Sequence, residues 1–477
     1  MLPDSRCDEY LYSVPKFDLD RDDISDFCHE LKGFHEHFSE SFQRSEPREH
    51  FYNYMAGQFS GLERKSIEPI ALALKDGNVR ALQRFVSDAP WDDDKIMSKY
   101  RSLVNDDLGS PDGALLFDES GFVKKGQNSV GVSRQYCGTI GKVDNCQVGV
   151  FAGYVSEHGY ALVDKRLFIP KRWFGEEYRE RRESCNLPTD TVFLTKPELA
   201  AKMLNALTSE DVLPFKYVLA DSIYGVSPEF IEAVEALPGK TYFVSVPGDT
   251  LCWLQRPMTM TKEYRWGGKK RTRTVLVDPD SKPLAVEKLA QNINNYFWYR
   301  RKVSEGTKGP IVYEFTRRRI ILSAAGLPKK TVWLLIRRTL GSEPQYTYFI
   351  SNAPNSTRLN TLVWLSGLRW AIEQCFQEAK TELGMDHYEV RKFPGRHHHM
   401  ITCMLAHFFL WHLKIRMGEK APAITLSQLR VLLKVILPMK QHTAETLIEQ
   451  IIWTQTKNHR AYMSHRKRHI SDVTIIQ

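Results

Sequence analysis

The sequence lacks the features that mark several large classes of protein. Its 477 residues contain no run of 18 or more apolar residues, so we expect no membrane-spanning helix. The opening stretch MLPDSRCDEY has neither the basic start nor the apolar core of a signal peptide. No G-x-x-x-x-G-K-[ST] phosphate loop is present, which argues against ATP use. We find no internal repeat and no low-complexity segment.

The cysteines are few and scattered. None of the eight belongs to a C-x-x-C pair, so neither a disulfide framework nor a zinc site is indicated. This usage fits reduced thiols, and we expect a cytoplasmic protein. Apolar content of 42% and charged content of 26% are ordinary for a chain that folds around a core. The length is sufficient for several domains.

Positive charge is in modest excess but unevenly placed. Lysine and arginine number 66 against 57 acidic residues, a difference of 9, while residues 1–30 are acidic. Several basic clusters alternate with aromatic residues, as in YFWYRRK, which is typical of polyanion binding, most simply to nucleic acid. The alternative is solvated charged faces. The clusters lie at 269–273, 300–302, 317–319 and 457–468.

The pattern of hydrophobic residues divides the chain into five parts. Residues 1–108 have helical periodicity and are predicted to form a DNA-binding region. Residues 109–247 and 356–415 are predicted to form an α/β core, and 248–355 a β-rich insertion. Residues 416–477 are predicted to be helical and basic. Strands are expected at 113–118, 145–156, 160–170, 216–221 and 241–247, with a hairpin turn at 157–159 between the second and third. Helices are expected at 196–207, from Pro228 with Ser227 as its N-cap, at 365–383, 397–415, near 426–437 and near 444–456.

Three acidic residues stand out by their positions. Asp118 ends the first strand, Asp221 ends the fourth, and Glu373 lies on the helix after the insertion. If the first and fourth strands are neighbours, these carboxylates can converge, and an oxygen-only pocket suits Mg²⁺ or Mn²⁺ rather than zinc. Each aspartate alone could simply begin a turn. Glu119 is a rival for Asp118, since adjacent strand residues point to opposite faces.

The helix predicted at 365–383 carries charged residues at regular spacing beside its apolar stripe. Arg369 and Glu373 are four residues apart, and Lys380 follows about two turns after Glu373. Considered alone, this arrangement is read most simply as a surface ion pair. Its place after five strands and an insertion favours a role for Glu373 in chemistry.

These residues and blocks resemble the bacterial insertion-sequence DDE transposases, in the cut-and-paste branch with a β-rich insert. That family carries Tyr-x2-Arg-x3-Glu-x6-Lys around its last acid. Arg369, Glu373 and Lys380 match this signature, whereas Ser366 stands where the family has tyrosine. The blocks at 118–142, 219–225, 369–391 and 458–468 extend the likeness over roughly residues 50–470.

The resemblance implies an RNase H-like mixed five-stranded sheet, interrupted by the insertion, and two Mg²⁺ ions held by Asp118, Asp221 and Glu373. It implies cutting at terminal inverted repeats and joining of 3′-hydroxyl ends to target DNA. A homodimer on paired ends, associated with the nucleoid, is expected. DNA contacts are expected from Arg369, Lys380 and the basic clusters of the insertion, including Arg300 and Arg301.

Other positions have two readings each. Lys124 and Lys125 could touch DNA phosphates or be exposed turn lysines. Trp298 could stack on an unstacked base or pack in the core of the insertion. Residues 397–399 are three consecutive histidines, which diverge by about 100° each on a helix and cannot easily share one ion. A helix-start or DNA-facing role is predicted for them.

Two other functions remain open from the sequence. An RNase H-like nuclease that only hydrolyses would carry the same acids. A non-catalytic DNA-binding protein derived from a transposase would need none of them, so the intact acids argue against it.

Overall fold

The computed structural model describes residues 16–74, 77–267, 269–306 and 309–437, with scattered positions between 439 and 466. The chain divides into two compact units, and each is described by itself. The first unit comprises Met1–Phe215, Glu305–Gly309 and Trp370–Gln477, and the second comprises Lys216–Ser304 and Pro310–Arg369.

The first unit begins with helices, as the sequence predicts. They are α1 (Arg21–Glu36), α2 (Ser45–Phe59), α3 (Ile67–Ala73), α4 (Val79–Ser87) and α5 (Asp93–Leu108). Asp20 starts α1 by accepting the backbone N–H groups of Asp22 and Asp23. Phe27, Leu31 and other apolar residues of these helices are fully buried.

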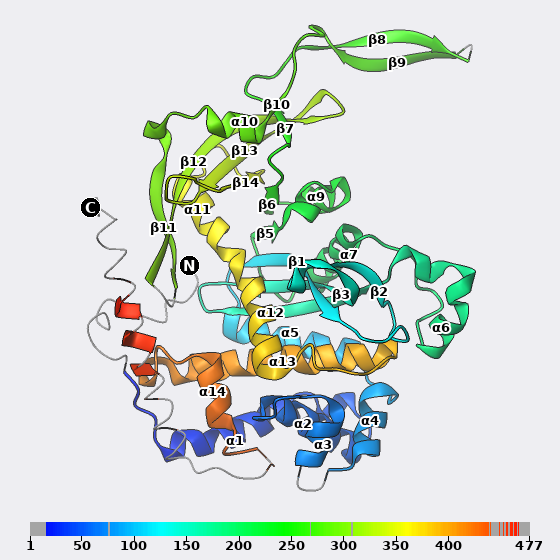
Figure 1. The fold of residues 1–477 in the computed structure, drawn as a ribbon, viewed down its shortest axis with the longest axis vertical. Coiled ribbons are helices and arrows are strands. Elements are labelled where there is room, and N and C mark those ends of the chain that lie inside the picture. The colour runs from blue at the N-terminus through cyan, green and yellow to red at the C-terminus, as the bar shows by residue number, and fades with distance from the viewer. Residues whose placement is uncertain are drawn as a thin grey trace. The chain divides into compact units, whose positions relative to one another are not determined.

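A long helix, α13 (Phe393–Met417), forms the centre of the first unit (Figure 1). The Tyr54 hydroxyl on α2 is 2.7 Å from His399 Nδ1 of α13. On α12 (Trp370–Leu383), a Glu378 carboxylate oxygen is 2.8 Å from His407 Nε2 of α13. α14 (Leu426–Leu433) also packs on α13. Helices from both ends of the chain therefore share one core.

The sheet of the first unit is antiparallel. Its strands are β1 (Ala114–Val123), β2 (Ser133–Cys137), β3 (Lys142–Val155) and β4 (Tyr160–Phe168). β3 pairs with β1, β2 and β4, and the predicted turn at 157–159 joins β3 to β4. The helices α6 (Arg179–Ser184) and α7 (Lys196–Glu210) follow, the latter begun by a capping box between Thr195 and Glu198.

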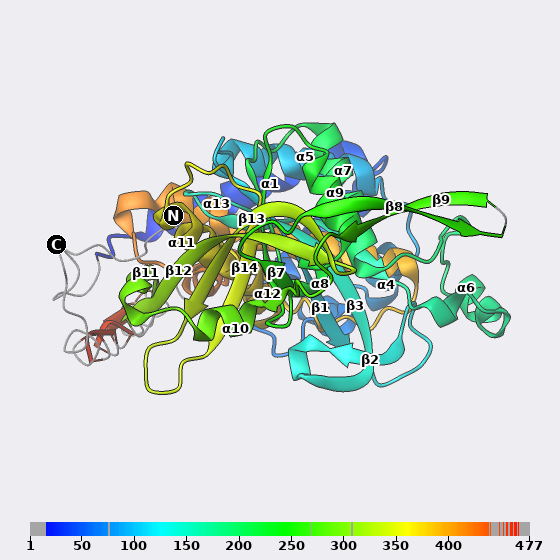
Figure 2. The same ribbon diagram turned by 90° about the horizontal axis from the view of Figure 1, so that it is seen from above.

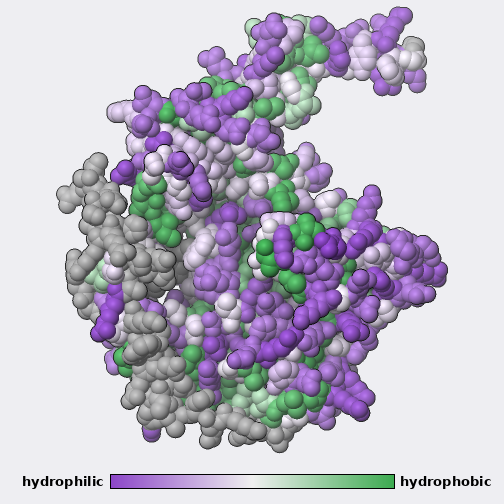
Figure 3. All heavy atoms as spheres, in the orientation of Figure 1, coloured by the Kyte–Doolittle hydropathy of each residue, from purple (hydrophilic) through white to green (hydrophobic). Residues whose placement is uncertain are grey.

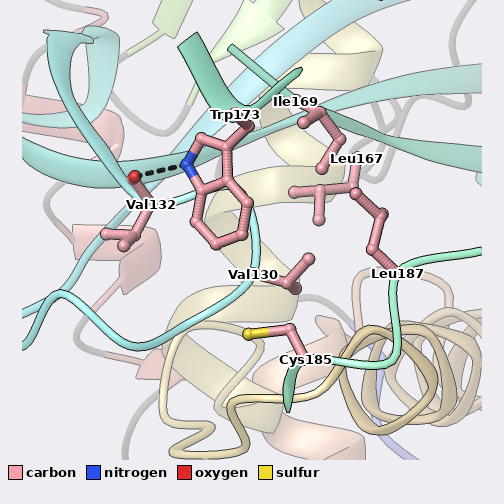
Figure 4. Packing of buried hydrophobic residues seen from close by; sticks show 7 residues of the cluster. All are labelled: Val130, Val132, Leu167, Ile169, Trp173, Cys185 and Leu187. Atoms are coloured by element: carbon pink, nitrogen blue, oxygen red, sulfur yellow. Dashed lines mark hydrogen bonds between the residues drawn. The ribbon is translucent and has the colours of Figure 1, made fainter. Parts of the chain in front are cut away.

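A small apolar cluster fixes the segment that follows β1 (Figure 4). The indole N–H of Trp173 donates to the carbonyl of Val132 at 2.9 Å. Seven buried side chains take part: Val130, Val132, Leu167, Ile169, Trp173, Cys185 and Leu187. The loop after β1 is thus held against β4 and the segment after it.

The second unit is built on a mixed sheet in the order β10-β7-β12-β13-β14-β6-β5, with β11 beside β12. β5 and β6 are parallel, whereas β14 runs antiparallel to both β6 and β13, and β12 runs antiparallel to β13. The strands are β5 (Tyr217–Ala220), β6 (Thr241–Val246), β7 (Leu251–Trp253), β10 (Leu284–Ala285), β11 (Tyr299–Gly306), β12 (Gly309–Ala324), β13 (Leu327–Arg338) and β14 (Tyr346–Ser351).

The same unit contains four α-helices and a separate hairpin among its described residues. The helices are α8 (Ser222–Gly225), α9 (Pro228–Glu235), α10 (Val286–Gln291) and α11 (Leu359–Leu368). Ser227 caps α9, as predicted, by accepting the N–H of Phe230. The hairpin of β8 (Thr259–Trp266) and β9 (Lys269–Leu276) extends away from the other strands of its unit (Figure 2).

The structure confirms a mixed α/β protein with a large mixed sheet and helical N- and C-terminal regions. The predicted single helix at 365–383 is wrong in its start and continuity. Its first part belongs to α11, which begins at Leu359, and Arg369 separates α11 from α12. The strand β2 was not predicted.

Two further expectations can be compared with the structure only for the residues that it describes. The helix predicted near 444–456 lies mostly outside them, as does much of the basic cluster at 457–468. In the part of the chain that the structure does describe, none of the helices is long and apolar enough to cross a membrane.

Candidate active site

Asp118 lies in the middle of β1, which continues to Val123, so the prediction that it ends the strand is wrong. It is on the face of the sheet that α12 covers. Its partner across the strand pair is Phe151, and directly opposed residues of an antiparallel pair share a face. The ring of Phe151 packs edge-on against Phe376 of α12 at 5.2 Å. Asp118 Oδ1 accepts the backbone N–H of Glu119 at 2.7 Å. The carboxylate of Asp118 is therefore directed toward the same face as α12.

Glu119 points to the other face of the sheet. A carboxylate oxygen of Glu119 accepts from Lys196 Nζ at 2.7 Å, and Lys196 is the first residue of α7. Both side chains are about four-fifths buried. The two adjacent acids thus face different helices: Asp118 faces α12, and the charge of Glu119 is paired with Lys196 of α7.

Helix α12 runs along β1 and β3 in a fixed register. A side chain at Gly153 would meet Ile372, and Gly153 is paired with Leu116. Phe376 packs at the level of Asp118, as above. Lys380, one turn further on, donates to the carbonyl of Gly121 at 3.1 Å. Glu373 follows Ile372 directly and precedes Phe376 by three residues. Its side chain therefore projects from α12 near the level of Asp118.

The environment of Glu373 suits a group that contacts a ligand. Its neighbours on the helix, Ile372 and Phe376, are buried, whereas Glu373 is exposed. The carboxylate therefore stands at the edge of the packed surface of α12. The predicted amphipathic stripe correctly identifies this edge, although the helix starts elsewhere.

Asp221 belongs to the second unit, where it follows β5 directly. Its Oδ1 accepts the backbone N–H of Ile223 at 2.9 Å, so it is the N-cap of α8. Gly225 ends α8 where a Cβ would lie 2.1 Å from the Ser245 carbonyl oxygen of β6. The close approach of α8 to β6 fixes the position of Asp221 within its own unit.

The side chains of Asp118, Asp221 and Glu373 each offer only carboxylate oxygens, a donor type that suits a hard divalent cation such as Mg²⁺. Asp118 and Glu373 come from two elements of one unit that pack together. Among the described residues, no group of three or more His, Cys, Asp or Glu side chains is arranged as a metal site.

Lys380 is held in the first unit rather than extended into solvent. Its Nζ donates to Gly121 O and to Thr139 Oγ1 at 2.9 Å, and lies 5.1 Å from the centre of the Phe122 ring. Burial lowers the pKa of Lys380. In this position Lys380 ties α12 to β1 close to Asp118.

Arg369 directly follows α11 as its C-cap, in the second unit. Ser366, which replaces the tyrosine of the signature, is buried in α11, and its hydroxyl donates to the carbonyl of Val363 at 2.6 Å. This hydroxyl is used by its own helix, so Ser366 offers no replacement for a tyrosine contact in this conformation.

Lys124 and Lys125, which follow β1, differ in burial and in contacts. Lys124 Nζ donates to the Tyr388 carbonyl at 2.7 Å and lies 3.2 Å from the centre of the Tyr388 ring. Burial, then the charge of Arg396, lowers the pKa of Lys124 to about 7. Lys125 is exposed. The expectation of an exposed turn lysine therefore describes Lys125 and not Lys124.

Trp298 is buried in the second unit, with 7% exposure. The Arg338 guanidinium lies 4.1 Å from its ring, and Tyr346 packs against it edge-on at 5.9 Å. The core-packing alternative describes this environment, since a base could not reach the ring here.

Arg300 and Arg301, which follow Trp298 closely in the sequence, have hydrogen-bond partners within the second unit. Arg300 Nε donates to a Glu314 carboxylate oxygen at 3.0 Å. Arg301 Nε donates to the side-chain oxygen of Asn360 at 3.1 Å. Arg300 is nevertheless exposed and Arg301 half-buried.

The three histidines of α13 are interior residues, so the predicted DNA-facing role is wrong. His397 Nδ1 is 2.9 Å from Lys165 Nζ, and His398 stacks on Trp91 at 4.0 Å. His399 is bonded to Tyr54, as described above. Burial lowers the pKa of His398 to about 4 and that of His399 to about 3. They diverge into separate contacts, as helical geometry predicts.

Sequence reasoning did not identify the side chains that share a face with the basic cluster at 269–273. Lys262, Tyr264 and Trp266 of β8 are exposed on the strand paired with it. The alternation K-x-Y-x-W opposite K-x-R-x-R was the available signal.

Comparison with known proteins gives the family. The model of the DDE superfamily endonucleases matches residues 37–310, more than half of the chain. The chain belongs to this family. Membership confirms the resemblance drawn from the acids and their blocks, and it implies nuclease or transposase chemistry.

Two individual proteins are also similar to this DDE endonuclease chain. A probable transposase for insertion sequence element IS701 of Microchaete diplosiphon is 26% identical over 344 residues, covering 71% of this chain and 76% of the relative. A cryo-EM structure of a piggyBac transposase synaptic complex with hairpin DNA aligns with 99% of this chain and 84% of that chain. Its sequence identity is 9% and its TM-score 0.36, too low to establish a common fold.

Proposed function

We propose that this protein is a DNA transposase that cuts at the ends of its insertion sequence and joins the 3′-hydroxyl ends to target DNA. The observation that carries the proposal is the packing of α12 on β1, which directs Asp118 and Glu373 to one face of the sheet of the first unit. The family assignment and the similarity to a transposase of an insertion sequence support it.

We assign Asp118, Asp221 and Glu373 as the ligands of two Mg²⁺ ions, for which Mn²⁺ can substitute. When bound, the ions would supply the positive charge that activates the attacking oxygen and stabilises the leaving oxygen of a phosphodiester. The assignment of Asp221 rests on its place after β5 and on the family pattern.

The remaining residues hold these carboxylates and the DNA. Lys380, through Gly121, keeps α12 in register with β1. Lys196 neutralises Glu119, which leaves Asp118 as the acid for the site. We propose phosphate contacts from Arg369, Lys125, Arg300 and Arg301, and from Lys380 if DNA draws it away from Thr139; these contacts would make binding depend strongly on salt. To contact DNA, Lys124 would first have to break its contacts with Tyr388, and Trp298 would have to separate from Arg338.

The architecture proposed for this function is an RNase H-like core at 109–247 and 356–415, with the insertion at 248–355. Residues 1–108 and 416–477 are proposed to assist DNA binding. The expected partners are duplex DNA with terminal inverted repeats, target DNA, and a second copy of the chain on paired ends. We expect the protein in the cytoplasm, at the nucleoid.

The adjacent acids of β1 provide a test with a matched control. We expect Asp118→Asn to reduce strand cleavage by at least about a hundredfold, since it removes a carboxylate ligand of the proposed Mg²⁺ ions. Glu119→Gln should retain cleavage within roughly threefold, because its partner is Lys196 on the other face. The substrate is the DNA that flanks the coding region, with Mg²⁺.

Cleaved and joined products should be scored in the same reactions. Cleavage without any joined product would instead support the nuclease that only hydrolyses. Equal loss in the two variants, or loss in Glu119→Gln alone, would overturn the assignment of Asp118. Cleavage by neither variant nor the wild type would favour the non-catalytic DNA-binding protein.

A further inference from the structure

The β8–β9 hairpin is an exposed ribbon that the proposed cleavage chemistry does not use. Its strands pair in antiparallel register from Thr259 opposite Leu276 to Trp266 opposite Lys269. Every residue of β8 and the first six of β9 are exposed. Figures 1 and 2 both show the ribbon extending away from the other strands of its unit. Its surface is mainly hydrophilic (Figure 3).

The register divides the ribbon into two unlike faces, since directly opposed residues share a face and alternate residues change face. One face, here called the cationic face, has four positive side chains, two aromatic rings and no acidic residue. Its charged and aromatic members are Lys262, Tyr264, Trp266, Lys269, Arg271 and Arg273. Trp266 is 70% exposed, and the Arg273 guanidinium lies 5.7 Å from the Tyr264 ring.

The opposite face is nearly neutral. It carries two cations, Arg265 and Lys270, which are directly opposed, and one acid, Glu263, next to them on the same face. The rest of this face is mostly threonine. The two faces of one ribbon therefore differ in net charge by three, although both are exposed to the same solvent.

The cationic face is locally unfavourable for an isolated protein. Each face has one pair of directly opposed cations, a position in which like charges destabilise a pair. The Arg265–Lys270 pair has Glu263 beside it to offset the repulsion, whereas the cationic face has no acid beside Lys262 and Arg273. Two-stranded hairpins are themselves marginally stable in water. A sequence that departs from local stability at an exposed surface indicates that the surface serves a partner. A polyanion would remove the repulsion.

We propose that the cationic face of this ribbon binds the phosphate backbone of double-stranded DNA. A two-stranded ribbon is narrow enough to enter the major groove, which is about 12 Å wide. The inference rests on the proposed function, which requires duplex DNA, and adds an arm that holds DNA through one face of β8–β9.

Other basic clusters of the insertion are engaged within their own unit. Arg317 and Arg319 lie 4.4 and 5.1 Å from the Trp333 ring, and Arg318 lies 4.9 Å from Phe297. Arg300 is paired with Glu314, as described above. The ribbon therefore offers its charges to a partner at a smaller cost in internal contacts.

Two double variants of the full chain test the proposal. Arg271→Gln with Arg273→Gln neutralises two cations of the cationic face, and Arg265→Gln with Lys270→Gln removes the same charge from the opposite face. Binding would be measured by fluorescence anisotropy over a range of salt, with a labelled duplex of about 40 base pairs and arbitrary sequence. Circular dichroism would confirm that each variant is folded.

We expect the cationic-face variant to bind the duplex about tenfold more weakly at moderate salt. The slope of log K against log salt should fall by about 2, because each substituted arginine leaves one DNA phosphate without its neutralising charge. The opposite-face variant should stay within about threefold of the wild type in affinity, with an unchanged slope.

Equal weakening in both variants would show a general charge effect and overturn the assignment to one face. Unchanged binding in both would overturn the ribbon as a DNA contact. The same titration would be repeated with a single strand of the same sequence. If the cationic-face variant bound only the single strand more weakly and the duplex normally, the choice of duplex DNA would be contradicted. A wild-type protein that does not bind duplex DNA would refute the proposed function itself.

Discussion

At the scale of single residues, neighbours in the sequence have opposite environments. Alternation along a strand was enough to predict that only one of Asp118 and Glu119 could enter the site. It could not tell which one, because the choice depends on Lys196 of α7 and on Phe376 of α12, both far away in the sequence. Non-local packing therefore decides which of the two adjacent acids faces α12, a choice that the local pattern leaves open.

The lysines after β1 give a prediction about stability and pH. The folded protein lowers the pKa of Lys124 to about 7, from 10.5, chiefly by burial. Above pH 7 the unfolded chain therefore binds more protons at this position, and the free energy of unfolding rises with pH. We expect Lys124→Met to reduce this rise by up to about 1.4 kcal/mol per pH unit.

Urea unfolding of the wild type and variants between about pH 7 and pH 8.5 would measure the effect. Lys125→Met is the matched control, because Lys125 is adjacent but exposed, and its pH dependence should equal that of the wild type. A Lys124→Met protein with the wild-type pH dependence would contradict the burial of this ammonium group.

At the scale of elements, α8 illustrates how a short helix positions a predicted acid. Gly225 lies so close to β6 that a Cβ would be 2.1 Å from a backbone oxygen. We expect Gly225→Ala to displace α8 and to destabilise the fold by about 1–3 kcal/mol. Cleavage should fall more than this loss of folded protein explains, because Asp221 caps the displaced helix.

Cleavage rates per folded molecule, with the folded fraction taken from urea curves, would test this. Gly126→Ala is the control, since its added methyl group meets nothing within 4 Å. Full activity per folded molecule in Gly225→Ala would argue against a role for α8 in positioning Asp221.

Elements with strong local signals were predictable. The apolar runs of β1, β5 and β6 and the Ser227 cap of α9 appear where the sequence indicated. The strand β2 (Ser133–Cys137) was missed, because SRQYC is short and has no apolar run; β3 defines it by pairing. The interruption at Arg369 was also missed, since the apolar stripe continues across it from Leu368 to Ile372, although Gly367 lies two residues earlier.

At the scale of the whole molecule, the sequence predicted a β-rich stretch from 248 but not its attachment. The structure joins it to earlier residues in one sheet, because β14 pairs with β6 and β6 with β5. The second unit accordingly begins at Lys216 rather than at the insertion. Strand pairs separated by about a hundred residues leave no local signal, so composition alone cannot reveal them.

The most direct test of the proposed function concerns Glu373, the acid of the signature that matches the family. Glu373→Gln and the matched control Gln377→Ala, one turn further along α12 and also exposed, would be assayed with Mg²⁺ on DNA carrying the flanking ends. We expect Glu373→Gln to lose cleavage and joining by at least about a hundredfold yet to bind the ends within about threefold of the wild type, while Gln377→Ala retains both activities. Cleavage that survives in Glu373→Gln would contradict the central claim.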